Sequence, residues 1–248
     1  TGSAIAALYA MGYTPEEIKE ICKEKYKKIL KIRKKVLCQM AINFLLHKET
    51  RVEGIIDGKL VENFINEAAK EKGKNIIADF KEKQLAIATV DTISMKECLF
   101  ISNEIKNKDE NIEYITDINI GKAVRSSMEF PAIFTTSNYE KYNFIDGGTV
   151  DNLPVQVLKD MGATKTIAIS FDLNKYTPSR SLEGVLVRAF DIFSHSGVEN
   201  ARKLADIAIE IYNPDTSLLS MDEIEKTIEN GYNAVMENKE KIKLIFDF

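Results

Sequence analysis

Hydrophobic and polar positions form successive blocks along the chain, and these blocks predict helices interleaved with short strands. Small apolar residues run from Ser3 to Met11 and predict a buried helix that ends at Gly12. Thr14, Pro15 and the two glutamates after them are typical of the cap and first turn of a second helix. Apolar residues at helical spacing predict further helices after Gly58 and at 120–128, 154–161, 182–204 and 221–236, and the tail predicts one more.

Continuous or alternating apolar residues predict the strands. Leu85–Asp91 and Glu97–Ser102 are joined by a connection of hairpin length, and a third strand ends at Asp146. The β-branched run Lys165–Phe171 suits a strand buried on both faces, and Asp206–Ile211 is a last, alternating strand. Strands that alternate with helices predict an α/β protein with a mainly parallel central sheet covered on both sides. With 248 residues, 44% of them hydrophobic, we expect a single domain over 1–248.

The clearest potential for chemistry lies where the third strand ends. The apolar run stops at Asp146, and Gly147 and Gly148 follow, so the carboxylate is presented from a tight loop with open space beside it. Pro154 suits the first turn of the next helix, with Asn152 as its cap. An isolated Asp-Gly-Gly is more often an ordinary turn with a solvated acid, so this stretch alone does not establish a site.

Charge and cysteine content exclude some classes of protein. A formal net charge of -4 argues against nucleic acid as the main partner, because phosphate binding requires a basic face. Cys22, Cys38 and Cys98 are odd in number and widely spaced, which favours reduced thiols in the cytoplasm over a disulfide framework. No two of them have the spacing of a metal site, so we expect no bound metal. The longest strongly apolar run, 36–46, is too short to span a bilayer.

A lysine-rich segment, Lys23–Lys35, lies within and beyond the second predicted helix. Such a segment most often forms a solvated helix face. The alternative is contact with a membrane surface, in which the basic side chains meet anionic head groups and the apolar residues after them enter the interface. The sequence therefore leaves two locations open, the cytoplasm and the periphery of a membrane.

Two segments far apart in the chain together resemble the patatin-like phospholipases. The chain opens with Thr1-Gly2-Ser3 and reaches the phrase Ala10–Ile18 (AMGYTPEEI), which is similar to the end of that family's nucleophile elbow and the helix after it. Asp146-Gly147-Gly148 is similar to the family's second motif, and Ala123–Phe134 is similar to the phrase that precedes it. The resemblance extends to about Tyr232. It implies a three-layer α/β/α fold and a serine acyl hydrolase with a Ser-Asp dyad.

The resemblance also implies roles for individual residues. The nucleophilic serine would stand immediately before Thr1, outside this sequence, and Gly2 would be the last glycine of the elbow. Asp146 would act as the base, and Gly147 and Gly148 would complete its loop. The backbone N–H of Thr1, at the positive end of the first helix, would donate to the developing oxyanion. The implied substrates are phospholipids, lysophospholipids or other acyl esters, with no required cofactor.

Other polar residues in the resembling segments are given structural roles. Ser3, Ser126 and Ser127 lie in no elbow, so we expect them to pack within helices. Asp91 matches an acid of the family at the end of a strand, where hydrogen bonding is its expected role. Arg125 is either structural or helps to place Asp146.

Two alternatives to the dyad remain open. Only two histidines occur, His47 and His195, and His195 follows Asp146 as the chain order Ser-Asp-His requires. It falls within the predicted helix 182–204, however, where a surface or packing role is expected. The second alternative is a non-catalytic scaffold or pseudo-enzyme that keeps the fold without hydrolysing a substrate.

Overall fold

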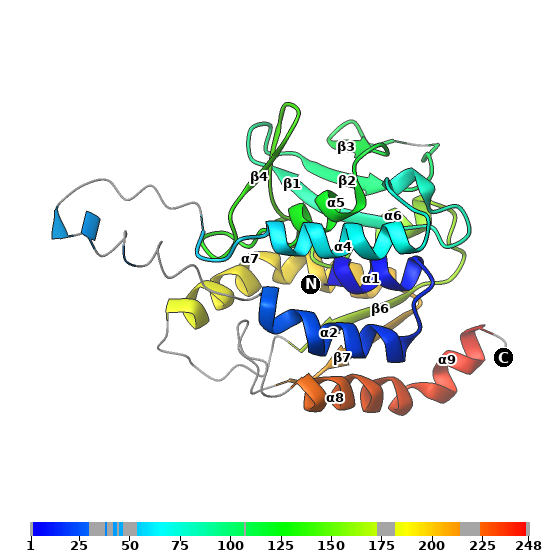
Figure 1. Cartoon of the computed structure of the whole chain (residues 1–248). Helices are drawn as coiled ribbons and strands as arrows, with labels where there is room; N and C mark the ends of the chain where they lie inside the picture. The colour runs from blue at the N-terminus through cyan, green and yellow to red at the C-terminus, as the bar shows by residue number, and fades with distance from the viewer. Residues whose placement is uncertain are drawn as a thin grey trace. The chain divides into compact units, whose positions relative to one another are not determined.

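The structure of the chain is a computed structural model, and it describes residues 2–29, 38, 42–43, 45–46, 54–106, 108–172, 182–213 and 224–246 (Figure 1). The chain forms two compact units. The first contains Thr1–Glu104 and Lys108–Gly147, and the second contains Ile105–Asn107 and Gly148–Phe248.

The first unit combines helices with a five-stranded sheet (Figure 1). Its described helices are α1 (Gly2–Ala10), α2 (Pro15–Ile29), α4 (Lys59–Glu71) and α5 (Ile120–Ser127), with a 3-10 turn η1 (Ile77–Asp79). Its strands are β1 (Ala86–Asp91), β2 (Glu97–Ile101), β3 (Ile112–Ile115), β4 (Ser137–Tyr139) and β5 (Tyr142–Asp146). The helices and the strands β1, β2 and β5 lie where the hydrophobic pattern predicts them, whereas β3 and β4 were not predicted.

The local sequence accounts for the start of α2. The Thr14 hydroxyl accepts a hydrogen bond from the backbone N–H of Glu17 at 3.2 Å, and the Glu17 carboxylate accepts one from the backbone N–H of Thr14 at 2.7 Å. These reciprocal bonds form a capping box, which satisfies two N–H groups that have no partner inside a helix. The predicted cap at Thr14 is therefore confirmed.

The sheet of the first unit has the strand order β3-β2-β1-β5-β4. Strand β1 lies between β2 and β5 and is antiparallel to both, with Thr89 opposite Asp146. Strands β4 and β5 are also antiparallel, with Ser137 opposite Phe144. Strand β3 runs parallel to β2. Strand β5, which ends in Asp146, is thus an inner strand with a partner on each side.

The α/β class is confirmed, but the five-stranded sheet is mixed rather than mainly parallel. Three of its four pairings are antiparallel. The connections explain two of these three pairings, β1–β2 and β4–β5, because parallel neighbours need a crossover of about a dozen residues or more. Only residues 92–96 separate β1 from β2, and only residues 140–141 separate β4 from β5, so each pair can form only a hairpin.

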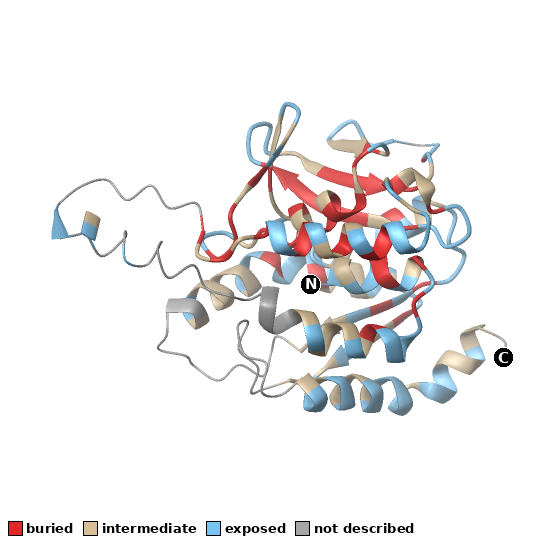
Figure 2. Ribbon diagram, viewed as in Figure 1, coloured by how far each residue is buried: buried red, intermediate tan, exposed pale blue. Residues whose placement is uncertain are grey.

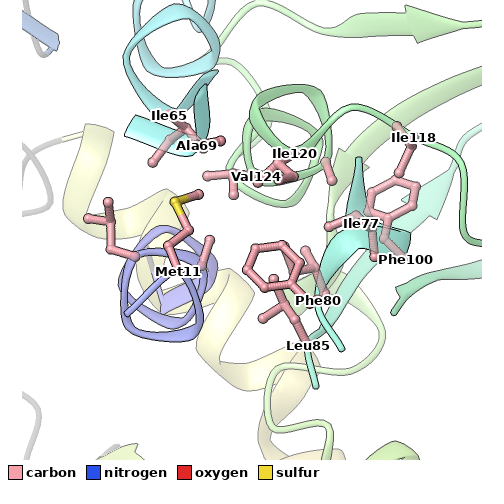
Figure 3. Packing of buried hydrophobic residues seen from close by; sticks show 14 of the residues in the cluster. Met11, Ile65, Ala69, Ile77, Phe80, Leu85, Phe100, Ile118, Ile120 and Val124 are labelled. Carbon is pink, nitrogen blue, oxygen red and sulfur yellow. The ribbon is translucent and has the colours of Figure 1, made fainter. Parts of the chain in front are cut away.

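The hydrophobic core of the first unit lies between its sheet and its helices. Figure 2 shows buried residues concentrated in α4, α5, β1 and β2. Side chains from different elements point toward one another in this core, among them Met11, Ile65, Phe80 and Val124 (Figure 3). In β5 the ring of Phe144 packs edge to face on Phe100, with 5.3 Å between ring centroids. This packing holds the strand that carries Asp146 firmly against the core.

The second unit is built on a two-stranded parallel sheet. Its helices are α6 (Val155–Asp160), α7 (Leu182–Leu204), α8 (Ile224–Glu237) and α9 (Lys239–Phe246), and its strands are β6 (Ile167–Phe171) and β7 (Ile207–Ile211). Helix α7 makes the crossover between the two strands, as parallel pairing requires. Its bounds, and those of β7, match the hydrophobic pattern.

Strand β6 differs from the prediction that it is buried on both faces. Ala168 is buried, but Ile169 and Phe171 are 51% and 56% exposed. Strand β6 pairs only with β7 among the described strands. A β-branched run therefore forms a strand here while one of its faces stays largely uncovered in the described residues.

Candidate active site

Asp146 lies at the carboxyl end of β5 and is half-buried. Successive side chains of a strand point to opposite faces of the sheet, so Asp146 shares a face with Phe144. Its pairing partner Thr89 lies on the same face, and the Thr89 hydroxyl is 3.3 Å from the carbonyl oxygen of Ser126 in α5. The carboxylate is therefore on the side of the sheet that α5 covers.

The main chain around Asp146 is held from two directions. Strand β4 pairs with β5 only as far as Phe144, and beyond that point the backbone N–H of Asp146 donates to the carbonyl oxygen of Glu129 at 3.1 Å. On the side of β1, the Thr89 hydroxyl donates to the carbonyl oxygen of Ile145 at 2.8 Å. The C=O and the N–H of the peptide group that joins Ile145 to Asp146 thus both have fixed partners.

Position 147 requires glycine because the backbone there passes directly over β1. A Cβ atom at this position would lie 2.3 Å from the carbonyl oxygen of Ala88 and 2.8 Å from the backbone nitrogen of Thr89. Such distances are far below van der Waals contact, so only glycine fits without moving the strands. The first glycine after Asp146 therefore allows the chain to turn close to the sheet, where it enters the 3-10 turn η2 (Gly147–Thr149).

The segment after η2 corrects one prediction of helix capping. Helix α6 begins at Val155 with Pro154 in the cap position, and no side chain caps it. Asn152 is exposed and does not serve as the predicted cap. Instead, the Asp151 carboxylate accepts a hydrogen bond from the backbone N–H of Leu153 at 3.2 Å, and burial raises the pKa of Asp151. The turn is thus stabilised by an acid one residue earlier than expected.

A buried charged cluster supports this end of the sheet from the side of α5. We call it the Arg125 cluster, and it consists of Glu62, Arg125, Glu129, Thr135 and Ser137. Arg125 donates to the Glu62 carboxylate at 3.1 Å and to the Glu129 carboxylate at 2.9 Å. It also donates to the hydroxyl of Thr135 at 3.3 Å. Arg125 is only 11% exposed, so its charge is compensated by two carboxylates rather than by water.

Gly58 makes room for Arg125, and Lys59 shares its acceptor Glu62. A Cβ atom on Gly58 would lie 2.9 Å from the Arg125 Nε atom, so a larger residue at Gly58 would push the guanidinium aside. Lys59 donates to Glu62, which pairs with both basic groups. Burial opposes ionisation of Glu62, but the hydrogen bonds from Lys59 and Arg125 prevail and lower its pKa.

Glu129 is the most deeply buried carboxylate of the cluster. Its side chain has no exposed surface, and burial raises its pKa to about 7 against the opposing effects of Ser137, Arg125 and Lys122. The folded protein therefore binds a proton on Glu129 more tightly than the unfolded chain does. Stability from this group is fully present below the ordinary glutamate pKa of 4.5 and is lost as the pH rises toward 7.

The direction of this pH dependence gives a prediction for the variant Glu129→Gln. The free energy of unfolding of the wild-type protein, relative to that of the variant, should fall by about 3 kcal/mol between pH 4.5 and pH 7, because each unit of pKa difference corresponds to about 1.4 kcal/mol. Urea denaturation of both proteins at a series of pH values measures this difference. Stability curves that stay parallel over that range would mean that Glu129 is ionised throughout.

Comparison with known protein families identifies the fold around these residues. The family model of the patatin-like phospholipases matches residues 1–159, which is more than half of the chain. The chain belongs to the patatin-like phospholipase family. Members of this family act on lipid esters, and the matched residues include both Gly2 and Asp146. The fold expected from the resemblance, with helices around a central sheet, is consistent with the structure.

The patatin motif at the start of the chain is only partly described. Thr1 lies outside the described residues, so its predicted role at the oxyanion stays a prediction. Gly2 is the exposed first residue of α1, and a Cβ atom on it would meet no atom within 4 Å. Ser3 lies in the first turn of α1, as predicted, and its hydroxyl oxygen is buried without a hydrogen-bond partner in the described part of the chain. A substrate therefore has no access to the Ser3 hydroxyl in this structure.

Ser126 and Asp91, two other polar residues of the patatin segments, have structural roles. The Ser126 side chain is completely buried and lies 3.2 Å from the Ser137 hydroxyl. The predicted hydrogen-bonding role of Asp91 at the end of β1 is confirmed. Burial opposes its ionisation, but donors from Ser94 and from the backbone of Asn143 prevail and lower the pKa of Asp91.

Neither histidine belongs to the described part of the first unit, which carries Asp146. His195 is exposed on α7 of the second unit, within the helix that the sequence predicts. His47 lies outside the described residues. A triad with His195 therefore stays an alternative to the dyad, and replacement of His195 tests it.

Only the first part of the lysine-rich segment 23–35 is described. Lys23 pairs with Glu20 and Lys25 pairs with Glu24 on α2, which is the behaviour of a solvated helix face. Residues 30–35 lie outside the described part, and membrane contact by this segment stays a prediction. Within the described residues, no helix is long and apolar enough to cross a bilayer, and no group of three or more acidic, cysteine or histidine side chains is arranged to hold a metal ion.

Sequence reasoning missed four residues of the Arg125 cluster. Glu62, Glu129, Thr135 and Ser137 were given no role, although the two glutamates carried a usable signal. Glu129 stands four residues after Arg125, the spacing at which opposite charges meet on a helix. Glu62 stands three residues before the buried Ile65, on the apolar side of α4. An acid in such a position generally has a buried partner.

Proposed function

We propose that this protein is a lipid acyl hydrolase that works through a Ser-Asp dyad, with Asp146 as the base and a serine immediately upstream of Thr1 as the nucleophile. The observation that carries the proposal is the placement of Asp146. It ends an inner strand, its main chain is fixed from both sides, and Gly147 turns the chain tightly against β1. Rigid placement is what a base needs in order to stay within hydrogen-bond reach of its partner.

The position of α1 also supports the proposal. The resemblance to the patatin motifs implies a nucleophile just before this helix, and both α1 and β5 pack against α5 within the first unit. The amino-terminal end of a helix carries a partial positive charge, which favours an anion beside it. A serine before Gly2 would therefore attack at a point where negative charge on the carbonyl oxygen is stabilised, and the N–H of Thr1 would donate to that oxygen.

The proposed reaction has two stages. In the first, the serine oxygen attacks the ester carbonyl while its proton passes to Asp146, and the tetrahedral intermediate collapses as Asp146 returns the proton to the departing alkoxide. In the second, Asp146 takes a proton from water, and the hydroxide attacks the acyl-serine. Collapse of the second intermediate releases the fatty acid, and the proton on Asp146 goes back to the serine oxygen. The substrates are phospholipids, lysophospholipids or related acyl esters.

The test is ester hydrolysis by the protein extended upstream of Thr1, which we call the extended protein. A short-chain chromogenic ester and a lysophospholipid should both be hydrolysed, and an organophosphorus probe should label one serine, located by mass spectrometry immediately before Thr1. Replacement of that serine by alanine should abolish labelling and hydrolysis together, because the covalent step has no other nucleophile.

Two matched variants separate the dyad from its rivals. Ser3→Ala should leave labelling and kcat within about twofold, since the Ser3 hydroxyl is buried in α1. His195→Ala should do the same, because His195 is exposed on α7. Loss of activity in His195→Ala would favour a triad, and a folded extended protein without labelling or hydrolysis would favour the scaffold.

A further inference from the structure

One buried residue contacts both the main chain of Asp146 and the strand beside it. Glu129 is 1% exposed, and its carbonyl oxygen accepts the hydrogen bond from the Asp146 backbone N–H. Its carboxylate accepts from the backbone N–H of Ser137 at 2.9 Å and from the Ser137 hydroxyl at 3.0 Å. Because Ser137 pairs with Phe144, Glu129 holds both strands of the β4–β5 hairpin at the end that carries the acid.

Arg125 in turn fixes Glu129. The Arg125 Nε atom donates to the Glu129 carboxylate, while the terminal nitrogens donate to Glu62 in α4 and to the carbonyl oxygens of Thr135 and Thr136 before β4. A planar guanidinium offers its donors in fixed directions, so these bonds together define one position of α5 relative to α4 and β4. Lysine, with a single donor group, cannot reproduce them.

We propose that Arg125 and Glu129 are positioning residues for Asp146, which hold its carboxylate at the place of reaction through the main chain of β5. The proposal rests on the proposed function, in which Asp146 is the base. Neither residue needs to touch the substrate. The Arg125 side chain and the Glu129 side chain are 11% and 0% exposed, and Glu129 is linked to Asp146 by the hydrogen bond between their peptide groups.

Disturbance of the hydrogen bond between Glu129 and Asp146 should affect the chemical step more than substrate binding. A base must lie within hydrogen-bond reach of the serine, and a displacement of about 1 Å can cost about 100-fold in rate. If Arg125 is replaced by lysine, the Glu129 carboxylate and the segment before β4 lose their common partner, and the Asp146 N–H loses a fixed acceptor. The consequence is a lower kcat with a nearly constant KM, together with faster exchange of the Asp146 amide proton.

The experiment compares Arg125→Lys and Ser137→Ala with Arg202→Lys in the extended protein. Arg202 is a matched control in the second unit, since its side chain is 9% exposed, pairs with Glu199 and Glu210, and donates to Ser170. Ser137→Ala removes one hydroxyl from Glu129 and is a milder change than Arg125→Lys, so it serves if the arginine variant does not fold. Kinetic constants are measured well below each melting temperature, and hydrogen exchange is followed by mass spectrometry in a peptide that contains Asp146.

We expect kcat to fall by about tenfold or more in Arg125→Lys and by a smaller factor in Ser137→Ala, with KM within about twofold in both. Exchange at Asp146 should accelerate in the same order. Arg202→Lys should keep its kcat and its Asp146 exchange despite a lower melting temperature. Equal kcat losses in Arg125→Lys and Arg202→Lys, or unchanged exchange at Asp146, would overturn the positioning role. Full activity in Asp146→Asn would instead show that Asp146 is not the base. The hydrogen-exchange result would then decide only whether Arg125 and Glu129 hold the main chain of β5.

Discussion

Asp146→Asn in the extended protein is expected to lower kcat for ester hydrolysis by about 10³-fold, in line with the contribution of a positioned general base. Asparagine has nearly the same volume and keeps the backbone N–H that donates to Glu129, so the strand should stay in place. The amide cannot take the serine proton, and KM should therefore change little. Steady-state kinetics with a chromogenic ester and a lysophospholipid measure both constants.

A second aspartate of the first unit supplies the control for this variant. Asp79 accepts hydrogen bonds from the backbone N–H groups of Asn75 and Ile76 at 2.7 and 2.9 Å, and these bonds lower its pKa. Asp79→Asn should cost stability, about 1 kcal/mol per weakened bond, but leave kcat within about twofold. Equal kcat in Asp146→Asn and the wild-type protein would exclude Asp146 as the base.

Gly147→Ala is the second change with a large expected effect. The new Cβ atom would lie 2.3 Å from the Ala88 carbonyl oxygen, so the end of β5 must move away from β1. We expect a loss of about 3 kcal/mol in the free energy of unfolding, as is usual for overpacking, and a large drop in kcat because the displaced residue adjoins Asp146. Chemical denaturation and steady-state kinetics give the two quantities.

Gly231→Ala is the matched control for the glycine change. Gly231 lies inside α8, and a Cβ atom there would meet the Ile211 side chain at 3.6 Å, an ordinary contact. Alanine is the better helix former by about 1 kcal/mol, so this variant should be as stable as the wild-type protein or more stable. Similar stability in the two glycine variants would show that the close approach of Gly147 to β1 is not maintained in solution.

The sequence predicted those parts of the fold that local pattern controls. Helix α7 is long and periodic, and its predicted limits agree with the structure because the same apolar face repeats over many turns. Strands β3 and β4 escaped prediction, since Ile112–Ile115 has only 4 residues and Ser137–Tyr139 only 3, too few to show a clear hydrophobic pattern. Such strands form because neighbours pair with them, and pairing between distant residues leaves little trace in the local sequence.

Some residues of the candidate site could likewise be predicted from local sequence, and others could not. Asp146 and its glycines could be found from the sequence because a strand end followed by Asp-Gly-Gly is a local pattern with a family likeness. The buried surroundings of Glu129 could not be found, because its bonds to Ser137 and to Asp146 depend on how the β4–β5 hairpin meets α5. The spacing of four residues between Arg125 and Glu129 could have indicated an ion pair, but it would not have indicated what the pair holds.

Strand β5 is clamped at both ends by groups outside it. The Asp91 carboxylate accepts the backbone N–H of Asn143 at 2.9 Å, and the Glu129 carbonyl oxygen accepts that of Asp146. A slip of one residue would turn Asp146 to the opposite face of the sheet, and these clamps oppose it without using any side chain of β5. The location of the acid is thus fixed by residues outside the strand, Asp91 and Glu129, as well as by the packing of Phe144.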